Sequence, residues 1–416
     1  MSTEPDVVTP GISLPAGEAP EEHPGLGQRI RDNVKSGNLG VLPVIAGEVA
    51  IIAFFSFTAT NFFTAPNFIN VIVQMAGVTM LAYGVVFVLL LGEIDLSIGY
   101  LSGIAALAVA EFQLPGSSHD YPGIIAIALA IILTGVIGLG QGTIVAKIGV
   151  PSFVVTLAGL LIWQGVILHV LEDRGVIIIE DSKVNDLANY FFSDTVGWII
   201  AAVVTAIYAV AALSGVIGRR RAGVATGTPV LALVKVIGVA VAAFGSVAIC
   251  NRVPRQGLPL AGLLMLVFLV GLTYLAKRTP FGRHVYAVGG NAEAARRAGI
   301  NVNRIRILVF MISGLMAGVG GVILAARVNS VDLNVGGGTL LLDAIAAAVI
   351  GGTSLFGGRG EVRSALFGSL VIATIANGMN TAGYSNGTIY VVTGVILLLA
   401  VTLDTVARRL QMKSGR

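Results

Sequence analysis

Long apolar runs separated by short polar stretches fill almost the whole chain after residue 38. Many of these runs are close to the roughly 20 apolar residues that an α-helix needs to cross a bilayer. The pattern predicts an all-α fold, a polytopic transmembrane helical bundle that occupies residues 39–410. We expect about twelve hydrophobic segments, at residues 40–59, 69–91, 98–113, 122–145, 152–171, 196–217, 229–250, 257–275, 306–327, 339–354, 364–382 and 387–406.

The third, fifth and tenth segments are short or bordered by glycine and proline. A helix of 15 residues is only about 22 Å long, which is less than the roughly 30 Å thickness of the hydrocarbon layer. We therefore expect some of them to be re-entrant or half-helices, surrounded by protein or by a water-filled cavity.

Composition supports the membrane assignment. Apolar residues make up 55% of the sequence and charged residues 12%, whereas soluble domains carry about 25% charged residues. The first 38 residues differ, because they are rich in proline, glycine and glutamate and have no apolar periodicity. We predict a disordered cytoplasmic tail at residues 1–38, which lacks the basic start and apolar core of a signal peptide.

The distribution of basic residues predicts the orientation. With a cytoplasmic N-terminus and alternating segments, most of the 26 lysines and arginines fall on the cytoplasmic side, as the positive-inside rule requires. Both termini are then cytoplasmic, and residues 277–306 form the largest cytoplasmic loop. The net charge of +4 reflects membrane orientation, and we expect a lipid bilayer and no nucleic acid as partner.

The stretch "NAEAARRAGI", residues 291–300, has the composition of a soluble helix inside that loop. Asn291 is a suitable N-cap, Glu293 suits the first turn, and Gly299 is placed to end the helix. Ala294, Ala295, Arg296 and Arg297 favour helix. We predict a short helix on the cytoplasmic face, and the alternative is an ordinary basic loop that only orients the chain.

The stretch "GEIDLSIG", residues 92–99, places two carboxylates next to the most apolar run of the chain. Asp95 or Ser97 could cap the next helix, or Asp95 could contact a substrate. A similar order of residues occurs in "SVDLNVGG", residues 330–337. In the predicted topology the two copies lie on opposite sides, as in an inverted repeat; the alternative is a chance match.

Several kinds of chemistry have no support in the sequence. "GGTSLFGGRG", residues 351–360, lacks the lysine and hydroxyl residue that end a phosphate-binding loop, so we predict a tight turn. We expect no catalytic residues, no metal site and no cofactor in this chain. Glu48, within the first segment, is expected to face protein or to snorkel from near an interface.

"EAARRAG", residues 293–299, resembles the cytoplasmic loop by which ABC importer permeases dock on their ATPase. "GEIDLSIG", residues 279–300 and "DAIAAAVIGGTSLFGGRG", residues 343–360, are similar to the ribose and xylose branch of that family, from about residue 65 onward. The proline often found downstream in the loop is missing. The resemblance implies a separate ATPase subunit that binds ATP, an external sugar-binding protein and a permease homodimer in a bacterial cell membrane.

The seventh and eighth segments resemble the extra helix pair that distinguishes xylose permeases from shorter ribose permeases of the family. A xylose-type pentose importer is therefore the first hypothesis, and a permease for branched-chain amino acids is the nearer alternative. An ion-driven transporter is a further alternative, with Glu48 and Asp95 as its only deep titratable groups. Polarity alone places these residues in the pathway: Gln74, Asp95, Ser97, Gln164, Thr353, Ser354, Asn377 and Asn380.

The same resemblance assigns contact with the ATPase to Glu293, Ala294, Ala295, Arg296, Arg297 and Gly299. We expect Gly299→Glu or Ala295→Trp to uncouple transport without unfolding the chain, because the helix should lie outside the bundle.

The topology can be tested by labelling a chain in which Cys250→Ser removes the native thiol. A Ser182→Cys variant should react with an impermeant thiol reagent from outside the cell. An Ala298→Cys variant should react only after the reagent reaches the cytoplasm. Labelling of both positions from the same side would contradict the topology.

Overall fold

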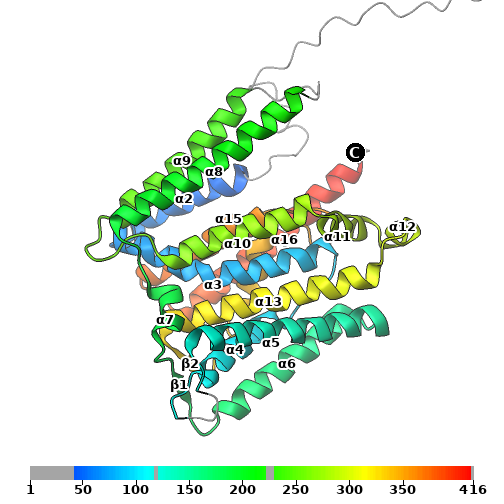
Figure 1. The fold of residues 1–416 in the computed structure, drawn as a ribbon, viewed down its shortest axis with the longest axis horizontal. Helices are drawn as coiled ribbons and strands as arrows, with labels where there is room; N and C mark the ends of the chain where they lie inside the picture. Colours follow the sequence, from blue (N-terminus) through cyan, green and yellow to red (C-terminus); the bar gives the residue numbers. More distant parts are fainter. Residues whose placement is uncertain (1–41, 117–119, 222–228, 414–416) are drawn as a thin grey trace, which may run out of the picture. The chain divides into compact units, whose positions relative to one another are not determined.

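The computed structural model describes residues 42–116, 120–221 and 229–413. The predicted tail, residues 1–38, lies outside this part of the chain. Each of the twelve predicted segments is a helix (Figure 1). These helices are α2 (Leu42–Thr58), α3 (Ala65–Leu90), α4 (Ile98–Phe112), α5 (Gly123–Thr143), α6 (Ser152–Leu171), α8 (Asp194–Arg221), α9 (Pro229–Cys250), α10 (Leu260–Arg278), α13 (Val302–Val328), α14 (Leu340–Ile350), α15 (Val362–Thr381) and α16 (Asn386–Lys413).

The remaining elements are short and connect the long helices. A π-helical turn, η1 (Ile144–Ile148), extends α5, and an antiparallel pair of three-residue strands joins distant loops. These elements are η1, β1 (Val176–Ile178), α7 (Ser182–Asn189), α11 (Pro280–Gly290), α12 (Ala292–Arg297) and β2 (Ser330–Asp332).

In the described part of the chain, eight helices are long and apolar enough to cross a membrane. This confirms the predicted polytopic helical membrane bundle. The third and tenth segments, α4 and α14, are short helices of 15 and 11 residues. The fifth, α6, has 20 residues and ranks among the eight long helices.

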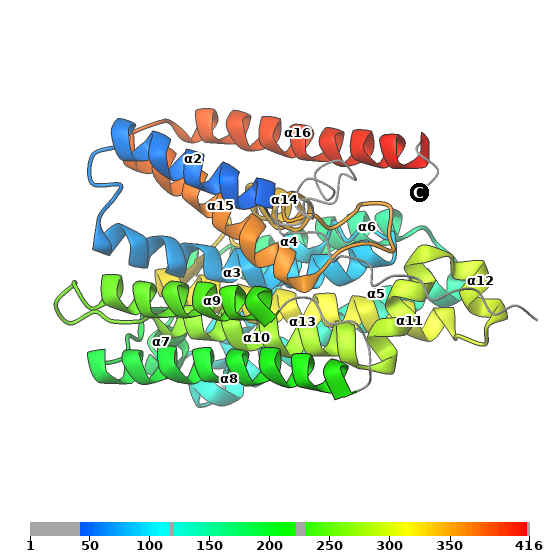
Figure 2. The same cartoon turned by 90° about the horizontal axis from the view of Figure 1, so that it is seen from above.

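Helices α3 and α13 form the centre of the bundle (Figures 1 and 2). They run antiparallel, because Gly77 of α3 faces Gly320 near the end of α13 and Gly84 faces Ser313 nearer its start. Helix α13 also packs closely on α5. Small residues permit this approach of backbones, which is the usual way helices associate in a lipid environment.

The chain order of long helix, Asp-Leu loop, short helix and long helix occurs twice, in α3–α4–α5 and in α13–α14–α15. Since α3 and α13 are antiparallel, the two loops enter the bundle from opposite ends. The short helices begin where these loops meet, with the backbone of Gly99 against that of Gly336. This arrangement is the one that the predicted inverted repeat requires.

The two ends of the bundle carry different elements. We call one the strand end, because it carries the β1–β2 pair, the contact of Asn189 with Asn329 and the hydrogen bond from Phe192 N to Leu258 O. We call the other the α12 end, which carries α11, α12 and the loop of residues 351–361 (Figure 2). The basic loops predicted to be cytoplasmic, residues 277–306 and 359–363, lie together at the α12 end.

One pair of helices lies at the periphery of the bundle. The pair of helices that stands apart from the bundle is α8 with α9 (Figure 1), the sixth and seventh segments. The stacked rings of Trp198 and Phe244, with centroids 5.9 Å apart, hold this pair together. Helix α10, the eighth segment, packs on α3, where the buried Tyr83 hydroxyl donates to Met265 O at 3.1 Å.

The α5–α13 contact should be sensitive to side-chain volume. A Cβ added at Gly138 would collide with the carbonyl oxygen of Phe310, whereas one at Gly140 of the same helix meets nothing within 4 Å. Gly138→Leu should therefore cost about 1–3 kcal/mol or more of stability and lower the melting temperature of the purified protein. Gly140→Leu is the matched control and should melt like the wild type. Equal melting temperatures for both variants would contradict the observed packing.

Candidate functional site

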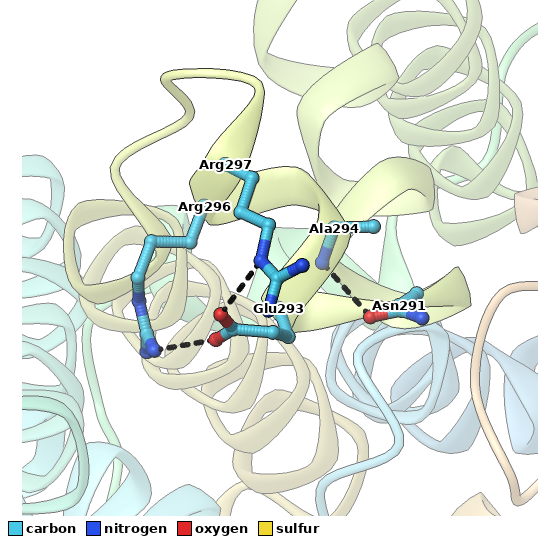
Figure 3. A network of polar contacts seen from close by, with 5 residues as sticks. All are labelled: Asn291, Glu293, Ala294, Arg296 and Arg297. Carbon is cyan, nitrogen blue, oxygen red and sulfur yellow. Dashed lines mark hydrogen bonds and ion pairs between the residues drawn. The ribbon is translucent and has the colours of Figure 1, made fainter.

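Helix α12 is a short, fully capped helix at one end of the bundle, as the sequence predicts. The Asn291 side chain accepts a hydrogen bond from Ala294 N at 2.9 Å. Glu293 pairs with Arg296 at 3.0 Å and with Arg297 at 3.2 Å (Figure 3). Such pairs stabilise a helix by a few tenths of a kcal/mol each.

The C-terminus of α12 is a Schellman motif. Gly299 N donates to Arg296 O and Ile300 N donates to Ala295 O, both at 3.0 Å. Gly299 has a φ of 83°, a left-handed conformation that favours glycine. The predicted end of the helix at Gly299 is therefore confirmed.

The two faces of α12 have different environments. Ala295 is only 5% exposed and packs in the main core cluster with Val302 and Ile305. The other face of α12 is exposed and carries Glu293, Ala294, Arg296, Arg297 and Ala298. Ala295→Trp would therefore disturb this chain's own packing, and Gly299→Glu would add backbone strain. Neither substitution is the clean test of docking that the sequence led us to expect.

Helix α12 is tied to the core through α11 and through glycine backbones. Gly289 of α11 lies directly against Leu90, the last residue of α3, and Gly358 N donates to Leu90 O at 2.9 Å. Gly357 packs against the backbones of Gly92 and Gly289. The three stretches that carry the family resemblance, residues 92–99, 279–300 and 343–360, therefore meet at one place.

Polar contacts reinforce the same junction. The Tyr286 hydroxyl donates to Gly360 O at 2.8 Å. Burial, and secondarily the nearby Glu361 carboxylate, raise the pKa of the Tyr286 phenol, so it keeps its proton as a donor at neutral pH. Glu361 also pairs with Lys277 at 2.5 Å and with Arg363. The loop of residues 351–361 is thus a turn between α14 and α15, as predicted, and it is fastened to α11.

Asp95 and Ser97 belong to a buried polar network that links α4, α5 and α13. Asp95 Oδ1 accepts from the amide and hydroxyl of Ser97, and its Oδ2 accepts from the Ser313 hydroxyl at 2.7 Å. The Ser97 hydroxyl also contacts Gln141 at 3.2 Å. Both Asp95 oxygens have partners within this chain, an arrangement that favours the structural interpretation over substrate contact.

The remaining polar residues assigned to the pathway do not form one site. Asn377 is buried, accepts from Asn67 at 2.8 Å and donates to Gln74 at 3.4 Å, so α3 and α15 bring these residues together. Gln164 lies on α6 and Asn380 is exposed at the end of α15. Thr353 and Ser354 belong to the 351–361 turn.

Sequence reasoning missed the contact of Glu48 with Thr374. The Thr374 hydroxyl donates to Glu48 Oε1 at 2.7 Å and joins α2 to α15. The two residues are 326 positions apart, and nothing in either local sequence indicates the pairing. Within the described residues, no group of three or more His, Cys, Asp or Glu side chains has the geometry of a metal site.

The fold defines the chain as a polytopic helical membrane protein, with the short helix α12 partly exposed at one end of the bundle. Residues 67–401 match the family model described as "Branched-chain amino acid transport system / permease component". The chain therefore belongs to this family of transport permeases and is a transport subunit, not an enzyme.

Relatives within the family extend the comparison. The xylose transport system permease protein XylH of Escherichia coli K12 is 35% identical over 379 residues, which is 90% of this chain and 94% of the relative. XylH of Haemophilus influenzae is 34% identical over 381 residues, 89% and 98% of the two chains. The ribose import permease protein RbsC of Escherichia coli K12 is 31% identical over 356 residues, 86% and 91%. No solved structure matches the chain.

The two faces of α12 predict different effects of one substitution. Ala295→Trp should lower the melting temperature, because overpacking a buried position costs about 1–3 kcal/mol. Ala294→Trp, one residue away on the exposed face, should leave it unchanged. A reversed order of melting temperatures would show that α12 is turned the other way.

Proposed function

We propose that this chain is the membrane-spanning subunit of an ATP-driven importer for a monosaccharide, with a xylose-type pentose as substrate. Helix α12 carries the proposal. It is a short capped helix with an exposed face, and it is fastened to the core by the two other family motifs. The similarity to xylose and ribose permeases supports the substrate class.

In this proposal a separate cytoplasmic ATPase binds and hydrolyses ATP, and α12 docks on it. An external binding protein delivers the sugar, and two copies of this chain form the pathway in a bacterial inner membrane with both termini cytoplasmic. Closure of the ATPases would displace α12. Since α11 contacts the end of α3 and the 351–361 loop, this displacement passes to α3, α14 and α15 together.

The alternatives need different features. A permease for branched-chain amino acids would share this fold, and the description of the family model favours keeping it as the second candidate. An ion-driven transporter needs titratable groups arranged as a relay. Asp95 has both oxygens occupied by Ser97 and Ser313, which leaves Glu48 without a neighbouring acid to relay to.

The test is uptake by proteoliposomes that contain this chain, its ATPase and its binding protein. Xylose uptake should require ATP, should persist when ion gradients are collapsed, and should not be reduced by excess leucine. Uptake of leucine instead of xylose would favour the amino-acid alternative, and uptake without ATP would contradict the importer proposal.

A substitution in α12 tests its docking on the ATPase separately. Ala294→Trp should reach the membrane at normal levels and lose the ATPase during purification, because a clash at a fitted contact costs roughly 2–5 kcal/mol, a weakening of one to several orders of magnitude. Ala206→Trp, at an exposed position of α8, is the control and should retain the ATPase. Retention by both variants would show that α12 is not the docking element.

A further inference from the structure

A cavity of about 260 Å³ lies between α2, α3, α9 and α15. Its lining includes Phe62 of the α2–α3 loop and Arg252, which follows α9. Glu48 and Thr374 line it as well. Glu48 lies ten residues before the end of α2, about 15 Å along the helix, so the cavity reaches well into the membrane layer.

The Glu48 carboxylate is incompletely paired. The side chain is only 8% exposed, and Thr374 donates to Oε1 at 2.7 Å. Oε2 is buried and has no hydrogen-bond partner within the described residues. A buried carboxylate oxygen without a donor is strongly unfavourable. Glu48 lines the cavity, so a ligand bound there is the expected source of the missing donor.

We infer that this cleft binds the sugar on its way through the membrane, with Glu48 Oε2 accepting a hydrogen bond from a sugar hydroxyl. The inference rests on the proposed function and adds a site to it. A hydroxyl supplies the missing donor without bringing a second charge into the membrane. A lipid tail would place only methylene groups beside Glu48, and would leave Oε2 unpaired.

Nine of the fourteen lining residues are apolar, and the polar ones besides Glu48 are Thr64, Asn67, Arg252 and Thr374. Both hydrogens of the Asn67 amide are used by Phe62 O and Asn377 Oδ1, so its oxygen remains as an acceptor. The rings of Phe62 and Phe68 offer apolar surfaces to the C–H faces of a sugar. The volume lies just below the roughly 300–1,000 Å³ of pockets for drug-sized ligands, which suits a monosaccharide.

The end of α9 also contributes to the cleft. Ile249 at the end of α9 lines it, and so does Arg252, which follows the helix. The Arg252 guanidinium has no ion-pair partner in the described part of the chain, so its donors are available to an entering hydroxyl. The end of α9 therefore has a role in this proposal, as part of one wall of the sugar site.

The experiment compares variants in proteoliposomes with ATPase and binding protein, using xylose and its mono-deoxy analogues as probes. Glu48→Leu should lower the maximal rate of xylose uptake about ten-fold, the effect of losing one hydrogen bond to a charged group. KM should stay unchanged, because the binding protein sets it. Glu111→Gln is the control, since Glu111 pairs with Arg174 outside the cleft at 2.7 Å, and it should transport normally.

The deoxy sugars separate contact from a structural role. In the wild type, one deoxy analogue should be transported more slowly than xylose; in Glu48→Leu, that analogue and xylose should be transported equally. If Glu48→Leu fails to reach the membrane, Glu48→Met, which keeps the length of the side chain but has no carboxylate acceptor, takes its place in the same comparison.

Normal xylose uptake by the Glu48 variants would overturn the inference. It would also be overturned if the rate loss caused by the variant and the rate loss caused by the deoxy sugar were additive. The cleft would then hold water or lipid, and sugar transport by the wild type would still stand. If the wild type transports leucine and no sugar, the proposed function itself fails, and this site fails with it.

Discussion

Backbone-to-backbone contact at the α12 end is the constraint on which the rest of the structure depends. Gly289 lies against Leu90, and Gly357 fits between Gly92 and Gly289 with a φ of 84°. A side chain at these positions would push apart segments that are far apart in sequence. Because these contacts have no flexible side chains between them, α11, the end of α3 and the 351–361 loop are expected to move as one piece. The proposed function requires this mechanical property, because there α12 transmits a displacement of the ATPase to the bundle.

The same use of small residues continues through the bundle. Glycines at the α3–α13 and α5–α13 contacts let backbones approach, and the meeting of Gly99 with Gly336 lets two short helices begin inside the protein. In a membrane the hydrophobic effect contributes little to the association of helices, so close packing and buried hydrogen bonds must stabilise the contacts between them. The Asp95–Ser97–Ser313 network supplies such buried hydrogen bonds. It lies where the chain is not helical, so the polar groups of the chain need hydrogen-bond partners within the protein.

Local features were readable from the sequence, and tertiary ones were not. All twelve segments and both caps of α12 follow from apolar runs and from Asn291 and Gly299, whose effects are confined to a few neighbouring residues. The face of α12 that is buried depends on contacts with Val302 and Ile305. A helix of six residues is too short for the spacing of its apolar residues to indicate which face is buried. The separation of α8–α9 from α10, and the pairing of Glu48 with Thr374, arise from contacts between distant segments of equal hydrophobicity.

The two buried carboxylates show how structure separates roles that sequence leaves equal. Asp95 and Glu48 both lie in apolar surroundings, and both were candidates for a titratable pathway. Asp95 receives hydrogen bonds on each oxygen from its own chain, so its burial is compensated in the resting protein. Glu48 is compensated on one oxygen only, and its side chain lines a cavity. A carboxylate with one unpaired oxygen at this depth in the membrane costs free energy, which a ligand that donates a hydrogen bond can offset. Of the two carboxylates, Glu48 is therefore the candidate for a role in transport.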